Sequence, residues 1–162
     1  MDAYAAGIRI TCDDNHVYVP QYLNSLTADL NWILNPTATD RDTLPFNDLS
    51  PTENHRRLLE LAGDDNTRHL YHRFMDWGPT TDNVSMHYFR NGSQILLPFS
   101  FWRETHWKPE QLGTIFCATM HIDELRLTFH RAAWKLVWDW SSLKRNRVGE
   151  PGDATQPRNE AL

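Results

Sequence analysis

The fold is decided by residues 84–102, whose sequence is VSMHYFRNGSQILLPFSFW. The dipeptide Asn91-Gly92 divides this stretch into two apolar halves and suits the two positive φ angles of a type I′ turn. A turn at this dipeptide predicts a hairpin that sets Tyr88 opposite Ile95. The second strand is apolar on both faces and is therefore predicted to be central in a sheet. We expect a bulge or a one-sided pairing at Pro98, because proline has no N–H to donate.

Two other segments predict more strands. Apolar and polar residues alternate through 8–12 and again through 17–19, which is the pattern of two half-buried strands. With Asp14 and Asn15 at the turn, both apolar sets share one face, so these segments predict an N-terminal hairpin. Residues 114–118 are predicted to form a further strand.

The remaining segments have the spacing of helices. Apolar residues at helical intervals predict a first helix over 24–36. A second helix is predicted over 50–63, because a serine, a proline and a glutamate at its start form a capping box. A third helix is predicted over 64–77, where a Gly-Pro pair ends it. A long closing helix is predicted over 121–143.

This order of elements predicts an α+β fold. An antiparallel sheet, made of the N-terminal hairpin, the central hairpin and the further strand, is packed with three short helices and one long C-terminal helix. We expect residues 1–143 to form a single domain. Residues 144–162 are mostly polar and are predicted to form a flexible tail.

Composition narrows the function classes. The chain has 162 residues and a net charge of −5, whereas binders of duplex nucleic acid need a basic face, so we expect no nucleic-acid partner. Residues 1–30 lack a targeting pattern and the longest apolar run, 95–102, is too short to span a bilayer, so we expect no membrane partner and a cytoplasmic location. Cys12 and Cys117 are expected to be reduced, buried thiols, although one bridge between them also fits.

The closing helix carries two apolar stripes. One begins at Ile122 and has the spacing of a core face. The other consists of Leu127, Trp134 and Trp138, with Arg131 among them. Helices that are apolar all round usually lie inside a protein, so both stripes could be buried. Alternatively the second stripe contacts a partner, because tryptophan and arginine dominate the hot spots of protein interfaces.

A second candidate contact lies in the loop after the central strand, where Trp102 and Trp107 stand among charged residues. Loops at strand ends are natural places for binding. The two indoles could instead seal the edge of the core, because tryptophans are highly buried on average.

One group of residues has the composition of a metal site. Asp65, His69, His72 and Asp76 follow one another at helical intervals and form one line along the predicted third helix. Carboxylates and imidazoles are ligands for zinc and similar ions, but one straight helix cannot supply four ligands to one ion, so further ligands must come from elsewhere. The alternative is a solvated helix face with local charge pairs.

The common catalytic signatures are absent from the sequence. It contains no P-loop, dinucleotide fingerprint, nucleophile elbow, HExxH or paired CxxC motif. His87 and His106 could face each other or a cleft, but neither has an identified carboxylate or nucleophile beside it. We therefore expect no cofactor and favour a protein that is not an enzyme.

In size and general character the chain resembles bacterial immunity proteins, which are cytoplasmic and neutralise a toxin domain, although no motif links it to a particular family. That resemblance implies a small inhibitory protein that masks a partner, such as a basic toxin domain, through acidic and aromatic surface. The alternative is a metal-dependent hydrolase that uses the line of histidines and aspartates on the third helix. A homodimer is a further possibility.

Overall fold

A computed structural model of the chain describes residues 2–12, 18–34, 45–46, 48–61 and 67–148, with only the backbone course for 67 and 143–148. Its architecture is the predicted α+β fold. A four-stranded antiparallel sheet has β5 in its middle, with β3 and β4 along one edge and β6 along the other. The strands are β3 (Val84–Met86), β4 (Phe89–Asn91), β5 (Gln94–Phe101) and β6 (Ile115–His121).

The central hairpin has a register two residues away from the predicted one. Phe89 pairs with Leu96, and Asn91 is the last residue of β4 and pairs with Gln94. The turn therefore lies one residue later than predicted, and Gly92 opens it with a φ of 60°. Because the slip is by two residues, every side chain remains on the face that the sequence predicted.

Pro98 pairs on one side only, as predicted: its partner is Cys117 of β6, and it has no paired residue in β3 or β4. The N–H of His87 donates to the Pro98 carbonyl at 3.0 Å, and proline has no N–H to return a bond. The edge strand is broken into β3 and β4 at this point. Its outer side is covered by the chain beyond α3, since the Tyr88 N–H donates to the carbonyl of His72 and the Phe74 N–H to that of Met86.

The N-terminal hairpin forms at a different place from the predicted one. Its strands are β1 (Tyr4–Ala5) and β2 (Ile8–Arg9), and they form a two-stranded sheet of their own, whereas the sequence predicted that the hairpin is part of the main sheet. Ala6 and Gly7 make the turn with φ of 49° and 74°, the two positive angles of a type I′ turn. The prediction that residues 17–19 form a strand is wrong at Val19, which begins a helix, and the predicted turn at 14–15 lies outside the described residues.

All four predicted helices are present, but some of their ends differ from the predicted ones. The first begins earlier than expected, with its proline in the first turn, where a missing N–H is tolerated. The capping box at Ser50 is confirmed, and it joins the serine hydroxyl to the Glu53 N–H and the Glu53 carboxylate to the serine N–H. The helices are α1 (Val19–Leu34), α2 (Pro51–Glu60), α3 (Thr67–His72) and α4 (Ile122–Val148), and the 3-10 turns are η1 (Gly78–Thr80) and η2 (Pro109–Gln111).

Two of these helices differ most in length from the predictions. α3 ends at His72 rather than at Trp77, and the chain then runs beside the sheet edge. α4 continues to Val148, past the predicted end at Leu143. The rest of the predicted tail, 149–162, lies outside the described part of the chain.

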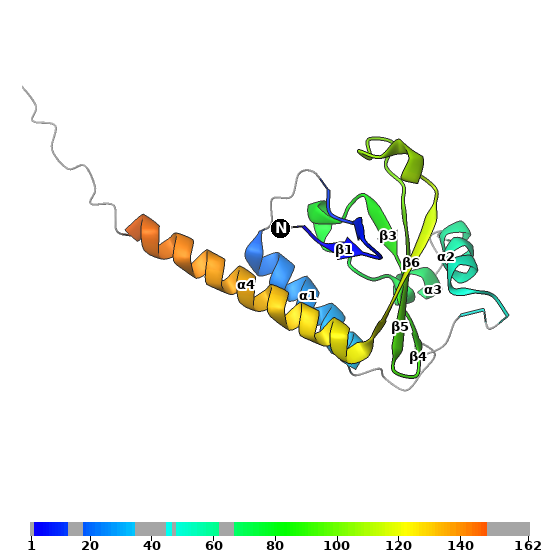
Figure 1. The fold of residues 1–162 in the computed structure, drawn as a ribbon, viewed down its shortest axis with the longest axis horizontal. Helices are drawn as coiled ribbons and strands as arrows, with labels where there is room; N and C mark the ends of the chain where they lie inside the picture. The colour runs from blue at the N-terminus through cyan, green and yellow to red at the C-terminus, as the bar shows by residue number, and fades with distance from the viewer. Residues whose placement is uncertain (1, 13–17, 35–44, 47, 62–66, 149–162) are drawn as a thin grey trace, which may run out of the picture.

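The sheet is covered on both faces (Figure 1). α2 packs on β5 and β6 from one side. α1 and α4 pack against each other on the other side, together with the β1–β2 hairpin. The first half of α4 lies along α1, and its second half projects beyond the body of the molecule (Figure 1).

A hydrophobic core cluster lies on the α1 and α4 side of the sheet. It joins aromatic and aliphatic residues of the sheet, including Phe99 and Phe101, to Tyr22 and Leu26 of α1 and to Phe129 of α4. Cys12 and Cys117 are half-buried free thiols rather than fully buried ones. Among the described helices, none is long and apolar enough to cross a membrane.

Candidate functional site

The two stripes of α4 have different environments. The inner stripe consists of Leu125, Phe129, Ala132 and Leu136, which contact the core cluster. Phe129 stacks on Phe74 with ring centroids 5.9 Å apart. Inner-stripe residues fall at intervals of three and four, so α4 turns this one face toward the sheet and α1.

The opposite face of α4 is exposed. We call the predicted second stripe, Leu127, Arg131, Trp134 and Trp138, the outer stripe. The exposed fractions are 49% for Leu127, 71% for Trp134 and 62% for Trp138, and Arg131 is also exposed. The sequence left open whether both stripes are buried, and the structure shows that the second one is not.

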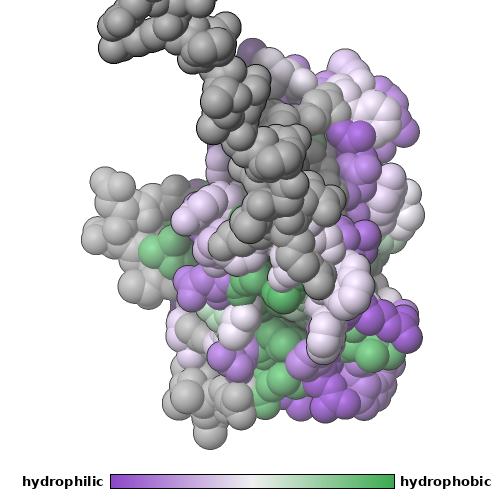
Figure 2. Space-filling model, turned by 90° about the vertical axis from the view of Figure 1, so that its left-hand side faces the viewer, coloured by the Kyte–Doolittle hydropathy of each residue, from purple (hydrophilic) through white to green (hydrophobic). Residues whose placement is uncertain are grey.

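Further apolar surface lies beside the outer stripe. Val137 and Trp140 of the projecting half of α4 are exposed as well. Figure 2 views the molecule from the side toward which α4 projects, and apolar atoms (green) gather in the lower middle of that face between polar margins (purple). Single exposed apolar residues are common on monomers, whereas large contiguous apolar patches are typical of interaction sites.

The charges next to the outer stripe are paired locally. Lys135 lies 3.0 Å from Asp139, and Arg126 lies 3.2 Å from Asp123. Both pairs are exposed, so each contributes little to stability. They leave Arg131 as the cation within the stripe itself. The four residues of the outer stripe therefore offer two indole rings, one leucine side chain and one guanidinium.

The loop after β5, residues 102–114, presents the second pair of predicted contact residues. Trp102 is 58% exposed and Trp107 46% exposed. The guanidinium of Arg103 lies 5.3 Å from the Trp102 ring and the ammonium of Lys108 lies 4.5 Å from the Trp107 ring. These are cation–π distances, so cations already cover part of both indoles.

His106 anchors this loop to the sheet. Its ring is buried and stacks on Phe101 with centroids 4.0 Å apart. Its two nitrogens contact Asn83 at 2.7 Å and Gln111 at 3.0 Å. His106 therefore does not face His87, although the sequence allowed that arrangement. Its contacts hold the loop in place.

The two tryptophan groups do not form one surface. The loop follows the end of β5 at Phe101, whereas α4 begins at the end of β6, where His121 pairs with Gln94 at the opposite end of β5. The length of the sheet therefore separates Trp102 and Trp107 from the start of α4 (Figure 1). The six predicted contact residues belong to two separate places.

The predicted line of metal ligands is not continued beyond α3. The helix ends at His72, which is buried, and its Nδ1 lies 3.3 Å from the Tyr88 carbonyl oxygen. Asp76 lies beyond the helix and pairs with Arg73 at 3.1 Å. Asp65 lies outside the described residues. Within the described ranges, no three side chains of His, Cys, Asp or Glu are arranged to hold a metal ion.

His69 instead belongs to a buried chain of hydrogen bonds, which we call the histidine chain. Its Nδ1 lies 3.1 Å from Nε2 of His87, and His87 Nδ1 lies 2.7 Å from Nδ1 of His55. His55 Nε2 lies 3.0 Å from the hydroxyl of Ser100. His55 and His87 are fully buried between α2 and the sheet.

Burial keeps this chain neutral. Burial away from water is the main reason why the pKa of His55 is lowered to about 4. The positive charges of His69 and Arg56 lower it further. Burial likewise lowers the pKa of His87. Repulsion from a protonated His55 lowers this pKa further. Neutral imidazoles donate through one nitrogen and accept through the other, so the chain is satisfied in either of two tautomeric directions.

The histidine chain has the bonding of a proton relay, because reversing the direction of every bond moves one proton from end to end. Only His69 of its histidines is half-exposed. Ser100 at the other end is buried, so a substrate has no direct access to its hydroxyl there. We therefore assign the chain a structural role, the satisfaction of polar groups between α2 and the sheet.

No protein-family model, curated protein or solved structure matches this chain.

Proposed function

We propose that this chain is a protein-binding protein whose contact surface is the outer stripe of α4. The observation that carries the proposal is the exposure of two indoles on one face of α4, Trp134 near the middle of the helix and Trp138 on the half that projects from the body. Burying an indole removes a large apolar area from water, and its N–H can pair with a partner at the same time. A projecting helix with such a face fits a groove on another protein.

The mode of action that we favour is inhibition of the immunity type, in which the bound chain masks a site on its partner, such as a toxin domain. The net charge of −5 supports a basic partner, because opposite charges speed the encounter. The outer stripe supplies mainly apolar contact. We therefore expect the net charge to affect the association rate of the complex and the two indoles to affect its dissociation rate. The free thiols of Cys12 and Cys117 support a reducing compartment such as the cytoplasm.

The test is affinity capture with the full chain from the source cell, followed by mass spectrometry. The variant Trp134→Ser/Trp138→Ser removes both indoles of the outer stripe. The matched control is Leu70→Ser, which removes an exposed apolar side chain of α3 that is 65% exposed. We expect one protein to be captured by the wild type and by the control but lost from the double variant. Equal capture by all three would contradict the proposal.

The charge contribution has its own test. With the captured partner purified, we expect the association rate to fall as salt is raised from low to physiological ionic strength, because screening weakens steering between opposite charges. An association rate that is indifferent to salt would remove the basic partner from the proposal and leave the indole contact.

A second copy of the chain is the other partner that the same surface could accept. Light scattering at several concentrations separates the cases. A dimer that the double variant abolishes would identify the partner of the outer stripe as the chain itself. A monomer at all concentrations is the result expected for a foreign partner.

A further inference from the structure

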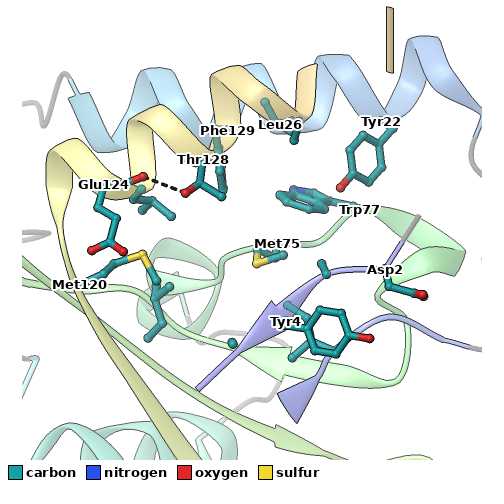
Figure 3. A pocket seen from close by; sticks show the side chains of 16 residues that line it. Asp2, Tyr4, Tyr22, Leu26, Met75, Trp77, Met120, Glu124, Thr128 and Phe129 are labelled. Carbon is teal, nitrogen blue, oxygen red and sulfur yellow. Dashed lines mark hydrogen bonds between the residues drawn. The ribbon is translucent and has the colours of Figure 1, made fainter. Parts of the chain in front are cut away.

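A cavity of about 400 Å³ lies on the core side of the sheet, away from the outer stripe. Its walls come from the N-terminal hairpin, α1, the sheet and the inner side of α4 (Figure 3). Most of its lining is apolar, including Leu26, Leu97 and Phe129. Its volume lies at the lower end of the range for pockets that bind small molecules, roughly 300–1,000 Å³.

The phenol of Tyr22 is the polar group of this cavity that most needs a ligand. Tyr22 is 2% exposed, and its hydroxyl has no hydrogen-bond partner within the described part of the chain. In Figure 3 the ring points from α1 into the space beside Trp77, with the oxygen at its inner end. A buried hydroxyl without a partner is costly, and native structures rarely keep one without a reason.

The wall around Tyr22 is held in place before any ligand binds. The Tyr22 and Trp77 rings meet edge to face with centroids 4.8 Å apart. The indole N–H of Trp77 donates to the Asp29 carboxylate at 2.7 Å. Such a wall needs little ordering when a ligand enters, which favours binding.

The charges around the cavity define what it excludes. Asp2 and Glu124 line it, and the described lining residues include no lysine, arginine or histidine. The Thr128 hydroxyl already donates to the Glu124 carbonyl at 2.9 Å, so it differs from the Tyr22 hydroxyl. Burial raises the pKa of Tyr22, so this phenol remains a neutral donor. Among the described lining residues, an anionic ligand would meet the exposed carboxylates of Asp2 and Glu124 and no lysine, arginine or histidine.

We propose that this cavity binds a small, mainly apolar molecule that carries a hydroxyl or carbonyl group and no negative charge. The apolar body fills the space between the hairpin and α4. The hydroxyl or carbonyl oxygen accepts a hydrogen bond from the Tyr22 phenol. The site is separate from the outer stripe, so it does not rest on the proposed binding of a protein.

Three matched probes test the assignment in the full chain: naphthalene, 2-naphthol and 2-naphthoate. Titrations followed by two-dimensional NMR of the backbone amides give affinity and location together. We expect 2-naphthol to bind roughly fivefold more tightly than naphthalene, which is the gain from one hydrogen bond. We expect 2-naphthoate to bind more weakly than 2-naphthol, and the amides of the cavity residues to shift.

The variant Tyr22→Phe keeps the ring and removes the hydroxyl. It should bind 2-naphthol no more tightly than naphthalene, with unchanged naphthalene affinity and no loss of stability. Ala132→Phe should fill the cavity and abolish binding of both probes, and Trp134→Ser on the outer stripe should keep wild-type affinity. If Ala132→Phe does not fold, the Tyr22→Phe comparison decides. Equal binding of 2-naphthol by wild type and Tyr22→Phe, 2-naphthoate binding as tight as 2-naphthol, or no shift of cavity amides with any probe would overturn the proposal.

Discussion

Asn54 shows how one side chain can hold a loop to a helix. It is fully buried in α2, and its amide donates to the carbonyls of Phe46, Leu49 and Ser50 at 3.0, 2.9 and 3.1 Å. Its oxygen accepts from the Phe46 N–H at 2.9 Å. Every hydrogen-bonding group of the side chain is therefore used, which makes this residue hard to replace.

We expect Asn54→Ala to lower the free energy of unfolding by about 3 kcal/mol, because it empties the space of a fully buried side chain and takes their Asn54 partner from the part-buried Phe46 N–H and Leu49 carbonyl. The comparison is Ser50→Ala, which removes only the exposed cap of the same helix and should cost about 1 kcal/mol. Urea unfolding monitored by circular dichroism measures both. A cost for Asn54→Ala no larger than that of Ser50→Ala would contradict the assigned network.

The histidine chain makes stability depend on pH. His55 and His87 have lowered pKa values in the folded protein, so between about pH 6.5 and pH 4 the unfolded chain binds protons that the folded protein does not. Stability should therefore fall as the pH is lowered through this window. Asp29 acts in the opposite direction, because burial raises its pKa to about 6 and the folded protein keeps that proton.

We expect Asp29→Asn to steepen this dependence. The Asp29 carboxyl binds up to one more proton in the folded than in the unfolded protein between about pH 4 and pH 6. Removing it should therefore raise the slope of the unfolding free energy against pH by up to about 1.4 kcal/mol per pH unit. Urea unfolding at intervals across that range gives both slopes. A wild-type stability that rises as the pH falls from 6.5, or a variant with a shallower slope, would contradict the assigned protonation states.

At the scale of elements, α4 divides its residues between two tasks. We expect Phe129→Ala on the inner stripe to cost about 3–5 kcal/mol, the usual loss for a buried aromatic side chain. Trp134→Ser/Trp138→Ser on the outer stripe should change stability by less than about 1 kcal/mol, because both indoles are exposed. Urea unfolding of the two variants checks this, and similar losses for both would show that the outer stripe supports the fold.

Elements with local signals could be predicted from the sequence. The capping box of α2 lies within a few residues, and so does the turn that pairs β4 with β5, so both were found, the turn to within one residue. The N-terminal hairpin turns at a place that the sequence does not mark, because Ala6, at a φ of 49°, is not a residue type typical of turns. Asp14 and Asn15 are more typical turn residues than Ala6, so the sequence favours a turn at 14–15.

The end of α3 and the histidine chain could not be found in this way. Phe74 and Trp77 continue the helical spacing beyond His72, but they are buried because the chain there runs beside the sheet edge, with Met75 at a φ of 59°. The histidine chain joins α2, α3 and the sheet edge. No spacing along the sequence predicts such a contact, because tertiary packing alone makes it.

For the whole molecule, α4 connects the two proposed sites. Its inner side lines the cavity beside Tyr22, and its outer side presents Trp134 and Trp138. The outer stripe was among the candidates that the sequence provided, because helical spacing separates it from the core face. The cavity was not, because its lining comes from segments far apart in the chain. Periodicity thus predicts faces, and the tertiary fold creates cavities.

The proposed function requires that a partner covers the outer stripe of α4. The most direct test is hydroxyl-radical footprinting of the full chain, alone and in complex with the captured partner. Trp134 and Trp138 should be oxidised in the free chain and protected in the complex, while Trp102 is oxidised equally in both. Equal oxidation of Trp134 and Trp138 with and without the partner would contradict the account.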